Sequence, residues 1–167
     1  MTYAQELLES ARKLLVSDNG KVTKSSDCNR AVSTAYYALF DCVCSIVADR
    51  VAGRLLDNLK PSAPWLRVYR SLDHRFVRDT LVRATQAEEY ETNSLSLIAT
   101  IFNRLLDARE FADYDRGKDY DVDAVLVKIF EAQFAVDRLE EFSVSSTREA
   151  DLLSKIIVEL LVLKPKR

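Results

Sequence analysis

The sequence predicts an all-α protein, built as an up-and-down antiparallel bundle of four to five core helices followed by a C-terminal helix. The 167 residues include only three glycines and three prolines, far fewer turn-forming residues than a β-sandwich or a barrel needs. Apolar residues recur along the chain with the 3.6-residue period of α-helices. Hydrophobic residues make up 48% of the sequence, enough for one domain that spans residues 1–167.

Three helices are predicted in the first half of the chain. The first covers about residues 3–16 and ends at the helix-breaking run Ser-Asp-Asn-Gly, residues 17–20. Ser26 or Asp27, both good N-cap residues, begins a second helix that continues to about residue 52. After a loop that contains two prolines, the third helix covers about residues 65–84.

Three more helices are predicted in the second half. Thr92 or Asn93 caps the fourth, which ends near residue 113. A polar loop, residues 114–121, leads to the fifth helix at about residues 122–142. The run Ser-Thr-Arg-Glu, residues 146–149, is a capping box that opens a sixth helix, rich in Leu and Ile, to about residue 163. A terminal helix this apolar either packs across the bundle or contributes to a subunit interface.

Composition and cysteine usage exclude several classes of protein. The 24 basic and 26 acidic residues give a net charge of −2, so the chain as a whole is not attracted to nucleic acid or a membrane. No uncharged apolar run reaches the roughly 18 residues of a membrane span, and the first residues do not resemble a signal peptide. Cys28, Cys42 and Cys44 lie in one predicted helix, and the chain has one histidine. We therefore expect a cytoplasmic protein with buried thiols, no metal, no cofactor and no membrane partner.

The fourth predicted helix carries charge where its apolar stripe should continue. Its core-facing residues lie within about 100° of arc, and they are Leu95, Ile98, Phe102, Leu105 and Leu106. One and two turns further on, the same stripe reaches Arg109 and Asp113. Charges on a core face are costly unless they are paired or line a cleft. Two interpretations follow: an Arg109–Asp113 ion pair at the end of the bundle, or an arginine that binds phosphate while Asp113 and Tyr114 orient it.

The third predicted helix has a basic side opposite its apolar side. Arg67, Arg70, His74 and Arg78 fall within an arc of about 80° if the helix is continuous. Such a face is typical of a surface that follows a nucleic-acid backbone, so the three arginines are candidate phosphate ligands. Residues 107–123 hold seven acidic and three basic side chains, so an internal or intersubunit salt-bridged face is the other interpretation.

The second predicted helix has a polar stripe opposite its core residues, formed by Arg30, Thr34, Tyr37 and Asp41. Small residues flank the stripe and would let another helix approach closely. A tyrosine on such a face suits an interface, because its ring is buried while its hydroxyl finds a partner. We therefore expect these four residues to contribute to a subunit interface.

Two segments of the chain resemble sequence motifs of the HEPN domain family. Arg30-Ala-Val-Ser-Thr-Ala-Tyr-Tyr-Ala-Leu-Phe40 is similar to the family's second-helix signature, Arg-Ala-x-Ser-x-Ala-Tyr-Tyr-Ala-x-Phe. Arg109-Glu-Phe-Ala-Asp-Tyr114 is similar to its later motif, Arg-x-x-Ala-Asp-Tyr, at the end of a long helix. The order and separation of the two motifs also fit, and the resemblance covers about residues 4–142.

The resemblance implies an up-and-down helical bundle, often a homodimer, of a kind common in prokaryotic toxin–antitoxin and defence systems. Many members are metal-independent ribonucleases that carry an arginine, four to six residues, and then a histidine. Two copies form one RNA-cleaving cleft, in which the arginine stabilises the phosphate and the histidine acts as acid or base. Partner proteins such as a nucleotidyltransferase or an antitoxin are also implied.

This sequence departs from the family pattern at the histidine. Counting from Arg109, the histidine should fall at position 114, 115 or 116, which hold Tyr, Asp and Arg. Glu110, next to the arginine, is unusual beside a phosphate. The spacing does occur between Arg67 and His74, but in the third predicted helix and outside the family's catalytic position.

Three functions remain open from the sequence. The leading hypothesis is a catalytically degenerate HEPN-like protein that binds RNA, a nucleotide or a partner protein. The second is an active endoribonuclease that uses Arg109 with Asp113 or Tyr114, or with His74. The third is a structural dimer or scaffold without a ligand.

Overall fold

A computed structural model describes residues 1–16, 24–55, 60–86, 93–115 and 119–162. These residues form seven α-helices and no strand, which confirms the predicted all-α helical bundle. The chain divides into two compact units. The first consists of Met1–Asp41 and Ile101–Asp137, and the second of Cys42–Thr100 and Arg138–Arg167. The boundaries between the units fall inside three long helices, so each unit is described below by itself.

The first unit contains α1 (Tyr3–Lys13) and parts of three longer helices, α2 (Ser25–Ala52), α5 (Ser94–Tyr114) and α6 (Val122–Val144). Aromatic rings meet at its centre: Tyr36 of α2 lies edge-on to Phe102 of α5, with ring centroids 5.7 Å apart. Both side chains are fully buried, as are Leu105 and Leu106 of the predicted α5 stripe. Burial of large apolar side chains is the main source of stability here, and aromatic pairs add to it.

Polar contacts attach α1 to α6. The Gln5 amide donates to Asp137 over 3.0 Å, and the Arg12 guanidinium donates to the Gln133 carbonyl over 2.9 Å. The opposite face of α1 buries Leu8 and two alanines, so the helix lies with an apolar side inward and a polar seam along α6. The helix ends at Lys13 rather than near residue 16, and the breaker run 17–20 lies outside the described residues.

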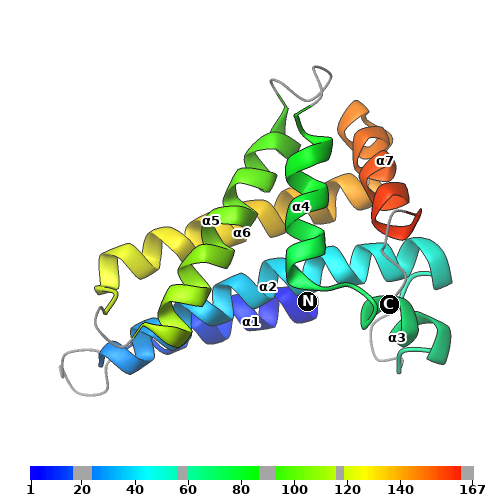
Figure 1. Ribbon diagram of the computed structural model, residues 1–167. Coiled ribbons are helices and arrows are strands. Elements are labelled where there is room, and N and C mark those ends of the chain that lie inside the picture. Colours follow the sequence, from blue (N-terminus) through cyan, green and yellow to red (C-terminus); the bar gives the residue numbers. More distant parts are fainter. Residues whose placement is uncertain (17–23, 56–59, 87–92, 116–118, 163–167) are drawn as a thin grey trace. The chain divides into compact units, whose positions relative to one another are not determined.

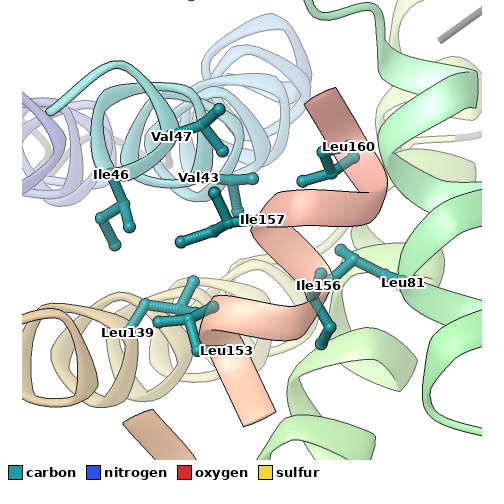
Figure 2. Close-up of a pocket in the computed structure, with 9 residues that line it drawn as sticks. All are labelled: Val43, Ile46, Val47, Leu81, Leu139, Leu153, Ile156, Ile157 and Leu160. Carbon is teal, nitrogen blue, oxygen red and sulfur yellow. The ribbon is translucent and has the colours of Figure 1, made fainter. Parts of the chain in front are cut away.

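The second unit contains α3 (Ala63–Tyr69), α4 (His74–Ala84) and α7 (Arg148–Val162), together with the remaining parts of α2, α5 and α6. α4 and α7 lie side by side (Figure 1). Figure 2 shows apolar side chains of α2, α4 and α6 converging on those of α7, with Val47, Leu81 and Leu139 among them. They leave a gap of about 10 Å³, too small and too apolar for a ligand. The apolar face of the C-terminal helix is thus buried within this unit.

The single helix predicted at residues 65–84 is wrong. The chain leaves the helix after Tyr69 and enters α4 only at His74. Asp73 is the reason: its backbone is extended, and its carboxylate accepts a hydrogen bond from the Phe76 amide at 2.9 Å, which is N-cap geometry. Arg67, Arg70, His74 and Arg78 therefore do not share one continuous helix face.

Several helix ends differ slightly from the predictions. α2 begins at Ser25, and Gly53 follows its last residue with a φ of 87°, a conformation that glycine adopts at little cost. Asn93 caps α5 by accepting from the Leu95 amide at 2.8 Å, whereas Thr92 lies outside the described residues. Thr147, not Ser146, caps α7 and accepts from the Ala150 amide at 3.4 Å. α6 continues two residues beyond 142, and residue 163 is not described.

α2 is a buried core helix in this structure. By length and composition alone it could cross a membrane, but 72% of its most apolar stretch is buried inside the protein. Such burial is common for the central helix of a bundle, so the helix is weak evidence in either direction. Its three cysteines are buried and are not joined in disulfides.

Candidate functional site

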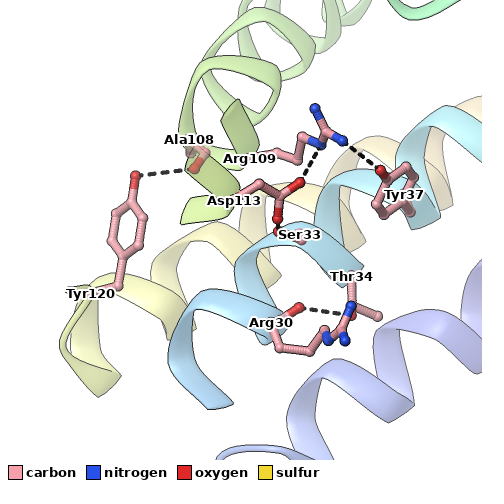
Figure 3. A network of polar contacts seen from close by, with 8 residues as sticks. All are labelled: Arg30, Ser33, Thr34, Tyr37, Ala108, Arg109, Asp113 and Tyr120. Atoms are coloured by element: carbon pink, nitrogen blue, oxygen red, sulfur yellow. Dashed lines mark hydrogen bonds and ion pairs between the residues drawn. The ribbon is translucent and has the colours of Figure 1, made fainter. Parts of the chain in front are cut away.

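The two segments that resemble the HEPN motifs meet in the first unit (Figure 3). The Ser33 hydroxyl of α2 donates a hydrogen bond to Oδ1 of Asp113 on α5 at 2.6 Å. One turn along each helix, Nη2 of Arg109 donates to the Tyr37 hydroxyl at 2.9 Å. Two hydrogen bonds thus join residues that lie more than seventy positions apart in the sequence.

Arg109 and Asp113 form the ion pair that their i, i+4 spacing predicted. Nε of Arg109 lies 2.8 Å from Oδ2 of Asp113. The Nε–H does not point along that line with hydrogen-bond geometry, so the contact is electrostatic. Only 17% of the Arg109 side chain is exposed. The guanidinium leaves from the core side of α5, as the stripe predicted, and is held by groups of its own chain.

Two aromatic rings border the guanidinium. Cζ of Arg109 lies 5.6 Å from the centre of the Tyr37 ring and 5.5 Å from the centre of the Tyr114 ring. Both distances are within the range of cation–π attraction. Nη1 of Arg109 points away from both Asp113 and Tyr37 (Figure 3). The site therefore offers a fixed cationic nitrogen beside Tyr114, whose side chain is 74% exposed.

The environment keeps Arg109 charged. Burial opposes the charge, but the hydrogen bond to Tyr37 and the attraction of Tyr37, Asp113 and Tyr114 outweigh it, so the pKa of the guanidinium is raised. Because Asp113 balances this charge, the pair is close to neutral as a unit. An anion that binds here would therefore be held mainly by hydrogen bonds from the guanidinium, and only weakly by long-range electrostatic attraction.

The polar stripe of α2 is only partly exposed. Arg30 and Tyr37 are exposed, and Thr34 is half-buried with its hydroxyl bonded to the Arg30 carbonyl at 2.8 Å (Figure 3). Asp41 is buried. The four residues of the stripe thus differ in exposure, and their role in an interface stays a prediction.

The basic residues predicted to form a phosphate-binding face belong to the second unit. Arg67 and Arg70 are exposed at the end of α3, and His74 is the first residue of α4. Arg78 pairs with its neighbour Asp79, with Nη2 2.8 Å from Oδ1. Since α3 and α4 are separate helices, the geometric argument for one basic face no longer applies.

Periodicity did not identify two contributors to the first unit. Ser33 is buried, although Arg30, three residues before it on the same helix, is exposed. Tyr120 donates from its hydroxyl to the Ala108 carbonyl at 3.5 Å, and its ring contacts Phe111 edge-on, with centroids 5.6 Å apart. Burial raises the pKa of Tyr120. Nothing in a loop sequence indicates that such a tyrosine folds back onto α5.

A shallow hollow lies next to Tyr120, between α5 and α6. It is lined by Arg104, Asp107, Ala108, Phe111, Asp119, Tyr120 and Lys128. Nζ of Lys128 lies 5.3 Å from the centre of the Tyr120 ring, and Arg104 pairs with Glu131 at 2.8 Å. The mixed charges of this hollow do not select one sign of ligand.

Within the described ranges, no group of three His, Cys, Asp or Glu side chains is arranged to hold a metal ion. Comparison of the chain with known protein families, with curated proteins and with solved structures finds no match. The resemblance to HEPN domains therefore rests on the two sequence motifs alone.

Proposed function

We propose that the chain is a HEPN-like protein of a prokaryotic toxin–antitoxin or defence type of system, which binds the phosphate of RNA or of a nucleotide without cleaving it. One observation carries the proposal: the two motif segments join through the Arg109–Tyr37 and Ser33–Asp113 hydrogen bonds. The same guanidinium lies 5.6 Å and 5.5 Å from the centres of the Tyr37 and Tyr114 rings, which restrict its orientation further.

The geometry of Arg109 supports phosphate binding. Its guanidinium is oriented by Asp113 and Tyr37, so little side-chain freedom is lost when a ligand binds. Nη1 points away from these partners and supplies donors that suit a phosphate oxygen. The exposed ring of Tyr114 offers a surface on which a base can stack, as in many single-stranded RNA sites.

The chemistry of the site argues against cleavage. Metal-independent RNA hydrolysis needs a group that takes or gives a proton near neutral pH. The three residues that occupy the family's histidine positions include no imidazole. The Asp113 carboxylate is already engaged by Ser33 and Arg109. An ordinary phenol titrates near pH 10, so tyrosine is a poor general base.

RNA binding by the full chain tests the proposal. Fluorescence anisotropy with a labelled single-stranded oligoribonucleotide should show saturable binding that Arg109→Ala weakens by at least about tenfold. Arg104→Ala is the matched control, because it removes an exposed arginine from the same helix and should change the affinity less than about twofold. Thermal melts of both variants check that they fold.

Three results would contradict the proposal. Equal affinity of wild type and Arg109→Ala would remove Arg109 from the binding site. Specific cleavage of the RNA, abolished by Arg109→Ala or by His74→Ala, would establish the endoribonuclease instead. If the chain binds no RNA or nucleotide at low salt, the structural scaffold is the remaining hypothesis for its function.

A further inference from the structure

A small hollow lies in the second unit, where the last turn of α2 meets the last turn of α6. Its volume is about 160 Å³, and it is lined by Ile46, Asp49, Arg50, Arg54, Ser143 and Val144. Binding sites for drug-sized ligands usually have volumes of about 300–1,000 Å³. This hollow therefore has room for a small molecule of a few atoms and not for a nucleotide.

Two arginines bring positive charge to the hollow. Among the described residues neither Arg50 nor Arg54 has a carboxylate partner, and Arg50 only donates a long hydrogen bond of 3.4 Å to the Ser154 hydroxyl. By contrast, Arg78 and Arg83 of the same unit pair with carboxylates at 2.8 and 3.3 Å. One arginine near the carboxyl end of a helix is favourable in itself. Two at the same hollow repel each other, so they favour a bound anion.

Asp49 limits the charge of that anion. Its Oδ1 accepts hydrogen bonds from Nε1 of Trp65 at 2.7 Å and from the Leu55 amide at 2.9 Å. These two N–H groups, rather than an arginine, hold the carboxylate at the hollow. With two arginines and one aspartate, the lining carries a single net positive charge, which a monoanion neutralises. The second charge of a phosphate would be repelled by Asp49.

Apolar side chains complete the lining. Ile46 is buried, and Val144, the last residue of α6, is 62% exposed. These side chains favour contact with a short hydrocarbon group, because that contact removes apolar surface from water. Guanidinium groups bind carboxylates with directed, charge-assisted hydrogen bonds. A ligand that uses the whole lining therefore combines one carboxylate with a short apolar group.

We propose that this hollow binds a small organic monocarboxylate. Its carboxylate lies between the guanidinium groups of Arg50 and Arg54, and its apolar group lies against Ile46 and Val144. None of these residues belongs to the Arg109 site, which lies in the first unit, so the inference does not depend on the proposed function.

The single tryptophan of the chain provides the measurement, because the Trp65 indole donates to Asp49 in the lining. Butyrate is the probe, and the full chain is titrated at constant ionic strength. The Trp65 fluorescence and the ¹⁵N–¹H signal of its indole should change saturably, with a dissociation constant of about 1 mM. Butyramide, which has the same shape but no charge, should cause no saturable change. If neither signal saturates up to about 50 mM butyrate, the inference is overturned.

Glutamine variants test the two arginines. Arg50→Gln and Arg54→Gln should each weaken butyrate binding by at least about tenfold, because each removes a charged donor. Arg75→Gln is the matched control: it removes an exposed arginine of α4 that does not line the hollow, and it should change the affinity less than about twofold. Thermal melts check that the variants fold. Equal butyrate affinity in all three variants would limit Arg50 and Arg54 to a structural role and overturn the inference.

Inorganic phosphate tests the class of anion. At about pH 8, where phosphate is mostly a dianion, it should bind more weakly than butyrate, because Asp49 repels its second charge. Asp49→Asn keeps an acceptor for Trp65 and Leu55, and it should strengthen phosphate binding more than butyrate binding. Phosphate that binds wild type at least about tenfold more tightly than butyrate would overturn the assignment to a monocarboxylate.

Discussion

The Ser33 hydroxyl donates to the Asp113 carboxylate across 2.6 Å, although eighty residues separate them in the sequence. Asp113 in turn lies 2.8 Å from the Arg109 guanidinium, which donates to Tyr37. Two helices are thus joined by a chain of contacts in which each polar group restrains the next. This connection fixes where the guanidinium lies, and the predictions below separate its structural from its binding role.

Ser33→Ala should destabilise the protein. The hydroxyl is buried, and the variant leaves one oxygen of a partly buried carboxylate without its donor, which costs about 1–3 kcal/mol in the free energy of unfolding. Urea denaturation followed by circular dichroism measures it. Thr34→Ala is the control, because the Thr34 hydroxyl only bonds back to its own helix. Equal stability of Ser33→Ala and wild type would show that the 2.6 Å contact contributes little.

Asp113→Asn should strengthen RNA binding at low salt by about two- to fivefold. The variant removes the negative charge that balances Arg109, while Tyr37 still orients the guanidinium. The gain should shrink as salt rises. Anisotropy titrations at two salt concentrations measure it, with Asp107→Asn as a control for loss of an acidic residue from the same helix. If Asp113→Asn abolishes binding in a folded protein, the carboxylate contacts the ligand itself.

Loss of the α4 N-cap should weaken the second unit. Asp73→Ala removes the acceptor of the Phe76 amide, so we expect a loss of about 1 kcal/mol in the free energy of unfolding. Asp73→Asn, which keeps an acceptor, should lose only a few tenths. A protein in which both variants unfold like wild type would indicate that the helix break at residues 70–73 does not depend on this cap.

The apolar contacts of α7 should contribute more to the stability of the second unit than the α4 N-cap does. Ile157→Ala removes a buried side chain that lines the gap in Figure 2, so we expect a loss of about 2–5 kcal/mol. Val158→Ala, its exposed neighbour, should change stability by less than about 0.5 kcal/mol. Similar losses from both would mean that α7 is not packed with its predicted apolar face inward.

Stability should fall at alkaline pH, partly because of Cys28. Burial, and after it the nearby carboxylates Asp27, Asp121 and Asp119, raise the pKa of this thiol. The folded protein therefore keeps a proton that the unfolded chain loses above about pH 8.5, so the contribution is complete below that pH and is lost above it. When the pH is raised from about 8 to 10, the free energy of unfolding of Cys28→Ala should fall less than that of wild type. Identical pH profiles for the two proteins would contradict this.

The helices with strong apolar periodicity were predictable from the sequence. Leu95, Phe102 and Leu106 are buried as expected, because a helix that passes through a core must repeat its apolar side every 3.6 residues. The break at Asp73 was missed, since aspartate fits both the polar side of a long helix and an N-cap.

The candidate site was predictable only in its local part. The Arg109–Asp113 pair follows from residues four apart on one helix. The contacts of Arg109 with Tyr37 and of Asp113 with Ser33 depend on how α2 and α5 are aligned. Helical periodicity gives the side on which each residue lies but not which residues meet across two helices.

The central claim, that Arg109 contacts bound phosphate, is tested most directly by following the Arg109 Nε–H signal in ¹⁵N–¹H spectra during titration with an oligoribonucleotide. The signal is assigned as the one that disappears from the spectrum of Arg109→Lys. We expect it to shift and to saturate at the same RNA concentration as the anisotropy titration. A signal that does not move while RNA is bound would contradict the claim.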